Sequence, residues 1–202
     1  MSLRHGIKQA KDFTVWLHER TNERNYPDGV RHRVSHAILQ LSEDIGDAIL
    51  VLLDANLPGP ALSLARPLFE SYVRGYWLLK CASDEQVEQF LGGKCPNFAV
   101  LLASIPMEAD SGGKWIHENC EKNLKTFHDL THGGSEHVKR RINKHSVEPS
   151  YSEEDLVSLL KLGNEIRIHI GVEFLSRLND GEGMEKLHQW SQALRTFRNE
   201  SN

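Results

Sequence analysis

Apolar residues recur every three or four positions through most of the chain, and no stretch alternates strictly between apolar and polar residues. Steps of three and four place side chains along one face of an α-helix, whereas alternation is typical of a half-buried strand. The clearest stripe lies in residues 30–52 and consists of Val30, Val34, Ile38, Leu41, Ile45, Ile49 and Leu52. The pattern predicts an all-α protein.

Residues 61–80 are apolar on nearly every side of a helix, which is typical of a helix in the centre of a bundle. Pro67 lies inside this segment. Because proline has no backbone N–H, it cannot donate to the carbonyl of Ser63, so the helix should kink at this position.

The same periodicity, with its Gly, Pro, Asn and Asp breaks, predicts the remaining elements. The expected helices are 5–23, 84–91, 97–104, 114–131, a short basic helix at 135–144, 152–178 with Ser152 as its cap, and 184–199. Residues 107–113 are expected to form a loop. We therefore predict one domain over residues 1–202, a single bundle of six to eight helices with a kinked central helix. Its core should span about 26–178, with 1–24 and 184–199 as flanking helices.

Charge and composition narrow the class of protein. The formal net charge is −4 and the pI is about 6.3, which argues against bulk DNA binding, so an anion site would have to be local. No apolar run reaches the roughly 20 residues that a membrane helix needs, and the N-terminus lacks the apolar core of a signal peptide. The three cysteines, Cys81, Cys95 and Cys120, form no C-x-x-C motif. These features predict a cytoplasmic protein without disulfides or cofactor.

Three charged residues follow one another in steps of four along the central segment: Arg66, Glu70 and Arg74. This spacing places a carboxylate between two guanidinium groups on one helix face. One interpretation is a structural ion network that braces the bundle beside Pro67. The other is a polar pocket in which one arginine binds an anion, because the guanidinium fork matches carboxylate and phosphate groups.

A second candidate is the junction Thr131-His132-Gly133-Gly134-Ser135, where glycine permits a helix to end and serine is suited to begin the next helix. The free N–H groups of that next helix, with Arg140 and Arg141 one to two turns further on, could bind a phosphate. The alternative is an ordinary corner between two helices with a capping serine.

Histidine is abundant, with eleven residues in the chain. His117, Glu121, His128 and His132 fall on one face of a helix, and His32 and His36 form a second pair four residues apart. Such spacing can bind zinc or iron, so a metal-dependent hydrolase stays open, and His128 and His132 would be the ligands. Surface or hydrogen-bonded histidines are the simpler explanation, and we predict no metal.

Two further patterns carry little weight. The motif R-x-x-x-x-H, which helical HEPN (higher eukaryote and prokaryote nucleotide-binding) ribonucleases use, occurs at Arg31–His36 and Arg140–His145, but chance alone should supply about two matches. The acidic residues Glu43, Asp44 and Asp47 are expected on a solvated helix face.

The runs Ala61-Leu62-Ser63-Leu64-Ala65-Arg66-Pro67-Leu68-Phe69-Glu70 and Thr131-His132-Gly133-Gly134 resemble an uncharacterised bacterial family of all-helical proteins, described as a domain of unknown function. The resemblance covers about residues 26–178, with the motifs R-P-L-x-E and T-H-G. It implies an intracellular all-α protein, grouped loosely with helical abortive-infection, toxin-like and HEPN-like proteins. It carries over no activity, and it places Arg66, Glu70 and His132 at the polar motif positions.

Three hypotheses follow. In the first, Arg66, Glu70 and His132 form the catalytic part of a pocket for a phosphate-bearing ligand, in its most specific form a ribonuclease of bacterial defence. Arg74, Gly133, Gly134, Ser135, Arg140 and Arg141 would bind the phosphate. The second is a non-catalytic regulatory or partner-binding bundle, and the third is the metal-dependent hydrolase. A homodimer through an apolar helix face is compatible with each.

Overall fold

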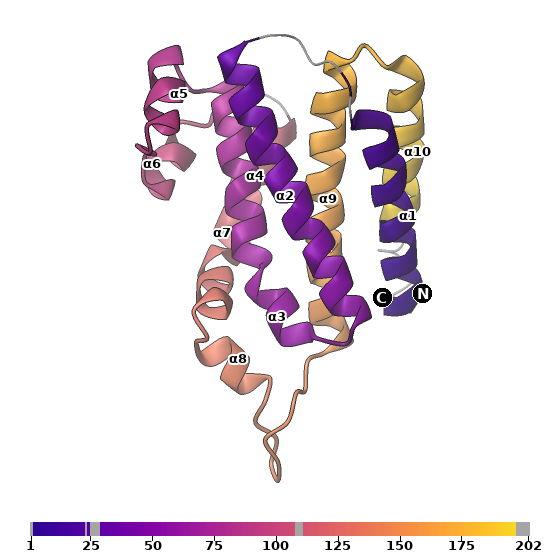
Figure 1. The fold of residues 1–202 in the computed structure, drawn as a ribbon. Helices are drawn as coiled ribbons and strands as arrows, with labels where there is room; N and C mark the ends of the chain where they lie inside the picture. Colours follow the sequence, from indigo (N-terminus) through magenta and orange to yellow (C-terminus); the bar gives the residue numbers. More distant parts are fainter. Residues whose placement is uncertain (1, 23, 25–28, 108–110, 197–202) are drawn as a thin grey trace.

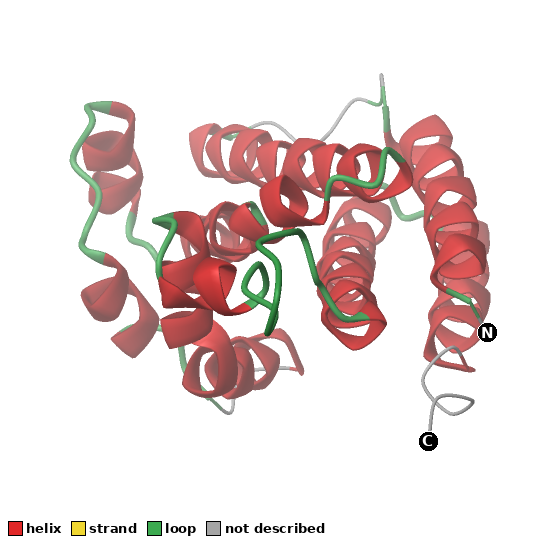
Figure 2. Cartoon of the chain, turned by 90° about the horizontal axis from the view of Figure 1, so that it is seen from below, coloured by secondary structure: helices red, strands yellow, loops and turns green. Residues whose placement is uncertain are grey.

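The computed structural model describes residues 2–22, 24, 29–107 and 111–196. The elements are α1 (Leu3–Thr21), α2 (Val30–Asp54), α3 (Pro58–Ser63), α4 (Ala65–Lys80), α5 (Asp84–Leu91), α6 (Phe98–Ala103), α7 (Ser111–Thr131), α8 (Ser135–Lys139), α9 (Glu153–Arg177) and α10 (Gly181–Thr196). In the described part of the chain, every regular element is a helix apart from an isolated bridge between Ile142 and Val147 (Figure 2). The predicted all-α fold is confirmed, although the described helices outnumber the six to eight that the sequence predicted.

The long helices lie side by side (Figure 1). Helices α2 and α4 run in opposite directions and form the most extensive helix pair, while α7 and α9 pack against them. Helices α1 and α10 lie on the far side of α9, and α5 and α6 lie beside the upper end of α4. At the lower end, α8 leads into a connection that projects away from the bundle.

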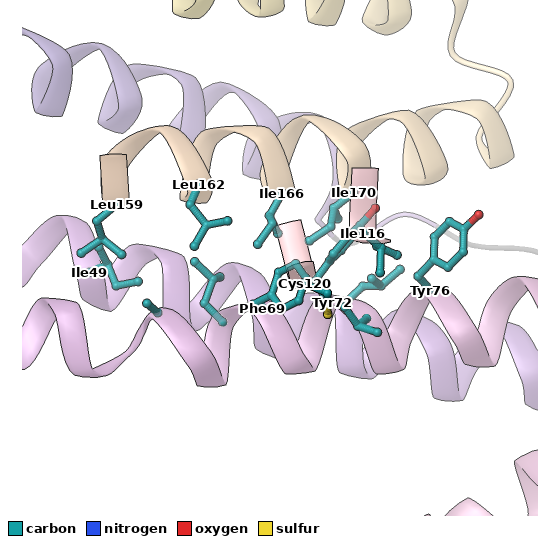
Figure 3. Close-up of a cluster of buried hydrophobic side chains, with 14 of the residues drawn as sticks. Ile49, Phe69, Tyr72, Tyr76, Ile116, Cys120, Leu159, Leu162, Ile166 and Ile170 are labelled. Carbon is teal, nitrogen blue, oxygen red and sulfur yellow. The ribbon is translucent and has the colours of Figure 1, made fainter. Parts of the chain in front are cut away.

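The main core lies where α9 meets α2, α4 and α7. Leu159, Leu162, Ile166 and Ile170 follow one face of α9 and point toward α4 (Figure 3). They meet the ring of Phe69, which is fully buried. A smaller apolar cluster between α1, α9 and α10 consists of Phe13, Leu17, Ile168, Leu175, Leu187 and Leu194. The burial of these side chains contributes about 25 cal/mol per Å² of apolar surface removed from water, and it is the main source of stability for the packed helices.

Helix α4 begins where the kink was predicted. The chain leaves the helical pattern after Ser63, at Leu64, and resumes it at Ala65, so that Pro67 lies in the first turn of α4. The carbonyl of Ser63, which Pro67 cannot serve, accepts a hydrogen bond from Thr131 Oγ1 of α7 at 3.1 Å. The two runs of sequence that carry the family resemblance therefore contact each other. Thr131, in the second run, donates the hydrogen bond that Ser63 O, in the first run, lacks at the helix break.

Several predicted boundaries change. Helix α7 begins at Ser111, inside the expected loop 107–113, of which residues 108–110 lie outside the described part. The expected basic helix 135–144 is α8 and ends at Lys139. Ser152 caps α9 as predicted, because its hydroxyl accepts from Asp155 N at 3.1 Å. Phe197, expected in the last apolar stripe, lies outside the described residues. Over the residues described, no helix is both long and apolar enough to cross a bilayer.

Candidate functional site

The three charged residues of α4 are bonded to one another. Arg66 Nε donates to Glu70 Oε1 at 2.6 Å, and Arg74 Nη2 donates to Glu70 Oε2 at 2.9 Å. The Glu70 side chain is only 13% exposed, whereas those of Arg66 and Arg74 are 25% and 33% exposed. Each carboxylate oxygen thus has one guanidinium donor, and the arginines extend from Glu70 toward solvent.

Helix α7 brings two histidines to the same place. Arg66 Nη1 contacts His128 Nδ1, and the rings of His128 and His132 meet edge to face with centroids 4.5 Å apart. Because a guanidinium group only donates, His128 Nδ1 must accept, and the proton of the neutral ring is on Nε2. Both histidines are exposed. We call Arg66, Glu70, Arg74, His128 and His132 the α4–α7 polar cluster.

The connection between Glu70 and His132 is indirect. It runs from Glu70 through Arg66 and His128 to the ring of His132. The sequence pattern identified Arg66, Glu70 and His132, but it considered His128 only as a metal ligand. Arg66 thus links the carboxylate on α4 to His128 on α7 and, through the His128 ring, to His132 immediately after α7.

The turn after His132 is formed by its glycines and by Asp129. Gly133 has φ +66°, in the left-handed region that favours glycine at a helix end. Gly134, not Ser135, occupies the N-cap of α8, and its N–H donates to Asp129 O at 2.8 Å. The Asp129 carboxylate accepts from Glu136 N at 2.5 Å, and a Cβ at Gly134 would overlap that carboxylate. The alternative in which Ser135 caps this helix is therefore wrong, and the Asp129 carboxylate bonds to one of the N–H groups that could have bound a phosphate.

The basic residues after α8 have different environments. Arg140 donates to Asp155 Oδ1 at 2.8 Å and to Glu136 Oε2 at 2.6 Å, and these bonds raise its pKa. Arg141 is exposed, with its guanidinium carbon 5.8 Å from the centre of the Tyr151 ring. Arg140 is therefore part of a salt bridge between α8 and α9, whereas Arg141 faces solvent.

A hydrogen-bonded group that the sequence did not reveal lies beneath this turn. His137 Nε2 lies 2.8 Å from Leu130 O and 3.0 Å from Ser63 Oγ, and His137 Nδ1 lies 3.0 Å from the hydroxyl of Tyr151. Because a carbonyl only accepts, Nε2 carries the ring proton, and Ser63 Oγ itself donates to Gly59 O. The histidine therefore does not take a proton from the serine, and the group joins α3, α7 and α8 to the start of α9.

The histidine pairs do not come together. His32 Nε2 contacts Arg177 Nη1 at 3.2 Å, and the His36 ring packs against Phe174 with centroids 4.6 Å apart. Burial, Arg177 and His32 lower the pKa of His36 to about 4. In the part of the chain that the structure describes, no three His, Cys, Asp or Glu side chains are grouped to hold a metal ion. The alternative of a metal site built from these histidines therefore has no support among the described residues.

The two R-x-x-x-x-H patterns also do not behave as sites. Arg31 bonds to the carbonyls of Leu78 and Ala82 at the end of α4, while His36 is only 6% exposed. In the second pattern Arg140 is bonded to two carboxylates, and His145 lies on the exposed segment after α8.

A second group of charges lies inside the bundle, between α2 and α9. Glu43 is 5% exposed and Arg167 is 2% exposed, and Arg167 Nη2 donates to Asp47 Oδ1 at 2.7 Å. Burial raises the pKa of Glu43 to about 8, although Arg167 opposes the shift, and burial lowers the pKa of Arg167. Within the described residues, Glu43 Oε1 and Arg167 Nε have no hydrogen-bond partner. We call Glu43, Asp47 and Arg167 the α2–α9 buried cluster.

The predicted solvated face was therefore wrong for Glu43, although Asp44 is exposed as expected. The signal was present, because Glu43 lies four residues after Leu39 and three before Gly46, which are both buried on the same face of α2. Because its side chain is acidic, Glu43 was not assigned to the buried face of α2 that contains Leu39 and Gly46.

A groove of about 780 Å³ runs between α7 and α9. Its apolar lining includes Trp115, Phe127, Leu130, Leu159 and Leu162, and its polar lining includes Asn119, Lys122, Asn123, Ser158 and Glu165. Arg140 and Asp155, which form a salt bridge, also line it. No member of the α4–α7 polar cluster does, so the exposed cluster and the groove are separate features.

Comparison with known proteins gave one match. The profile of a family described as "Family of unknown function (DUF6988)" aligns with residues 39–199, which begins within α2 and includes α10. No curated protein matched the chain, and no solved structure matched it. The match extends past residue 178, so the last helix, expected to flank the core, belongs to the family's common region.

Proposed function

The chain belongs to the DUF6988 family of unknown function, and on this premise we propose that the α4–α7 polar cluster binds a phosphate-bearing ligand and, in its most specific form, cleaves RNA. Such an activity would suit a protein of the bacterial toxin or defence type. The residues that carry the proposal are Arg66, Glu70, His128 and His132.

The observation behind the proposal is the continuous contact from Glu70 through Arg66 and His128 to His132. Glu70 orients Arg66 through Nε, and in the described part of the chain Arg66 Nη2 has no hydrogen bond. A guanidinium group that is fixed on one side and open on the other is suited to hold a phosphate. The two exposed imidazoles beside it are side chains of the kind that serve as general acids and bases.

The chemistry requires no metal. His132 would accept the proton of a ribose 2′-hydroxyl while that oxygen attacks the neighbouring phosphorus. The bond from phosphorus to the 5′-oxygen would break, and the His132 imidazolium would return its proton to that oxygen, giving a 2′,3′-cyclic phosphate and a 5′-hydroxyl. Arg66, with Arg74 behind Glu70, and His128 Nε2–H would stabilise the charge on the phosphorane.

The activity is tested with purified protein and a labelled single-stranded RNA in the presence of a chelator. We expect His132→Ala to lower the rate of cleavage about 10²- to 10⁴-fold, the range for loss of a general acid–base group. His188→Ala is the matched control, because His188 is also exposed but lies on α10. Expression in a bacterial host should degrade cellular RNA with the wild-type protein but not with His132→Ala. Intact RNA with the wild-type protein in both assays contradicts the proposed cleavage.

One observation favours a second candidate, a non-catalytic regulatory or partner-binding bundle. Both arginines of α4 are already bonded to Glu70 within one helix, and such pairs stabilise a helix without any ligand. In this case Arg66→Ala and His132→Ala would alter unfolding slightly and leave RNA untouched.

A further inference from the structure

The segment after α8 is an ordered hairpin that points away from the bundle (Figure 1). Ser150 N donates to Arg140 O at 2.7 Å, Glu148 N to Arg141 O at 2.8 Å and Asn143 N to Ser146 O at 2.9 Å. Ile142 and Val147 form an antiparallel bridge between its two sides. These bonds replace the helix that the sequence pattern predicted here.

The base of the hairpin is fixed to the helices. Arg140 bonds to Glu136 on α8 and to Asp155 on α9, and Tyr151, next to the hairpin, bonds to His137. The hairpin is thus pre-organised. Because its backbone is already ordered, a ligand that binds to it incurs a smaller loss of conformational entropy.

The charge of the hairpin is opposite to that of the whole protein. Residues 139–147 read Lys-Arg-Arg-Ile-Asn-Lys-His-Ser-Val and contain four Lys or Arg residues and no acidic residue, in a chain of net charge −4, and Glu148 follows them. Lys139 and Arg140 are paired with Glu136 and Asp155, whereas Arg141 and Lys144 have no ion pair among the described residues. Arg141, Lys144 and His145 are all exposed. The apolar side chains of Ile142 and Val147, which form the bridge of the hairpin, are 58% and 81% exposed. We call residues 139–147 the basic arm.

The basic arm begins close to the α4–α7 polar cluster. Only the Gly133-Gly134 turn separates His132 from α8, and α8 packs against α7. The N-terminus of α4, which carries Arg66, lies at the same lower end of the bundle (Figure 1). The base of the arm and the α4–α7 polar cluster therefore lie at the same end of the bundle.

We propose that the basic arm binds single-stranded RNA and presents its backbone to the α4–α7 polar cluster, an inference that rests on the proposed function. Arg141 and Lys144 face the phosphates, and Ile142 and Val147 contact the bases. The ligand is single-stranded because attack by a 2′-oxygen needs a backbone that can rotate until this oxygen, the phosphorus and the leaving 5′-oxygen lie in line, which a stacked A-form duplex resists. An acidic protein surface would match the charge but would not be cleaved by the cluster.

The test measures binding separately from cleavage. The probe is a short fluorescein-labelled single-stranded RNA with 2′-O-methyl groups, which lacks the attacking hydroxyl, and binding is followed by fluorescence anisotropy. We expect Arg141→Ala/Lys144→Ala to weaken binding about 25-fold at about 0.1 M salt and to reduce the slope of log affinity against log salt by about 1.4, as loss of two phosphate contacts on a single strand implies.

Matched variants control for net charge and folding. Lys94→Ala/Lys186→Ala removes two exposed cations remote from the arm and should leave the affinity within about twofold. Lys144→Glu changes only one exposed residue of the hairpin and should weaken binding by itself, with an unchanged urea midpoint. A duplex of the same sequence should bind more weakly than the single strand.

Failure of the arm and failure of the proposed function give different results. Suppose that wild-type protein cleaves unmodified RNA, and that Arg141→Ala/Lys144→Ala binds the probe as tightly as Lys94→Ala/Lys186→Ala does. RNA binding by the arm is then excluded, and the catalytic proposal stands. If the arm variants lose binding but no RNA is cleaved, the arm stands and catalysis fails. Wild-type protein that binds no RNA, including one that captures only an acidic protein, overturns the inference.

Discussion

The α2–α9 buried cluster and the α4–α7 polar cluster contain the same kinds of residue in opposite environments. In the first, Arg167 is almost fully enclosed and bonds to Asp47, while Glu43 keeps an oxygen without a partner among the described residues. In the second, Glu70 is bonded on both oxygens and the arginines around it reach solvent.

The difference shows that exposure, not residue type, separates a structural group from a candidate site. Burial raises the pKa of Glu43 to about 8 even with a guanidinium nearby, because removing a carboxylate from water costs more than the attraction returns. A protonated acid and an enclosed arginine cannot reach a ligand. The exposed cluster keeps access to solvent.

The largest effect on stability is expected from Arg167→Ala. The substitution leaves Asp47 without its bonded partner and creates a cavity at one of the largest fully buried side chains. Because Asp47 is itself 32% exposed, the expected loss of about 2–5 kcal/mol in the free energy of unfolding comes mainly from the cavity that a truncated core side chain leaves. Urea unfolding followed by circular dichroism measures it.

Arg74→Ala is the matched control for that prediction, since it removes one arginine from the exposed cluster. The Arg74 side chain is 33% exposed, and solvent-exposed pairs contribute under about 1 kcal/mol. Equal losses from Arg74→Ala and Arg167→Ala would contradict the contrast between the two clusters.

Glu43→Gln should change how stability depends on pH. An unfolded glutamate titrates near pH 4.5 and the folded Glu43 near pH 8, so between these values the folded protein keeps a proton that the unfolded chain has lost. Unfolding then releases a proton, and stability falls as the pH rises, by about 2 kcal/mol between roughly pH 6 and pH 8.

Glutamine cannot ionise, so the stability of Glu43→Gln should not show the part of the decrease between pH 6 and pH 8 that Glu43 causes in the wild-type protein. The measurement is the difference in unfolding free energy between wild type and Glu43→Gln at several pH values, which cancels groups common to both. A difference that stays constant from pH 5 to pH 9 would show that Glu43 does not hold a proton in the folded protein.

A smaller effect is expected from Asp129→Ala in the turn beside the exposed cluster. The substitution removes the carboxylate that accepts from Glu136 N and should cost about 1 kcal/mol, the typical value for a lost helix cap. Asp129→Asn keeps a side-chain oxygen and should recover most of the loss. No recovery, measured by thermal unfolding, would mean that the negative charge matters rather than the hydrogen bond.

Local patterns predicted much of the fold. The three- and four-residue spacing predicted the helices, α5 among them with the same bounds, and Pro67 predicted the break at the start of α4. Steps of four predicted the Arg66–Glu70–Arg74 arrangement, because residues four apart on a helix are neighbours whatever the rest of the chain does.

Contacts between distant segments were not predictable in the same way. Nothing in the sequence places His128 against Arg66, or the Asp129 carboxylate against Glu136 N, which is one of the N–H groups expected to bind phosphate. The segment up to residue 144 was expected to continue the basic helix but forms a hairpin instead. The Arg140 guanidinium group bonds to the Asp155 carboxylate, and the Arg140 carbonyl accepts a hydrogen bond from Ser150 N.

The sequence by itself determined that this protein is helical, where its central helix breaks and which charges share a face of α4, since each depends on interactions within one or two helical turns. Tertiary structure alone decided which carboxylate is buried, which histidines meet the arginine and which cations face solvent. Those properties depend on how separate helices exclude water from one another, and no spacing along the chain encodes the distance between two helices that only packing brings together.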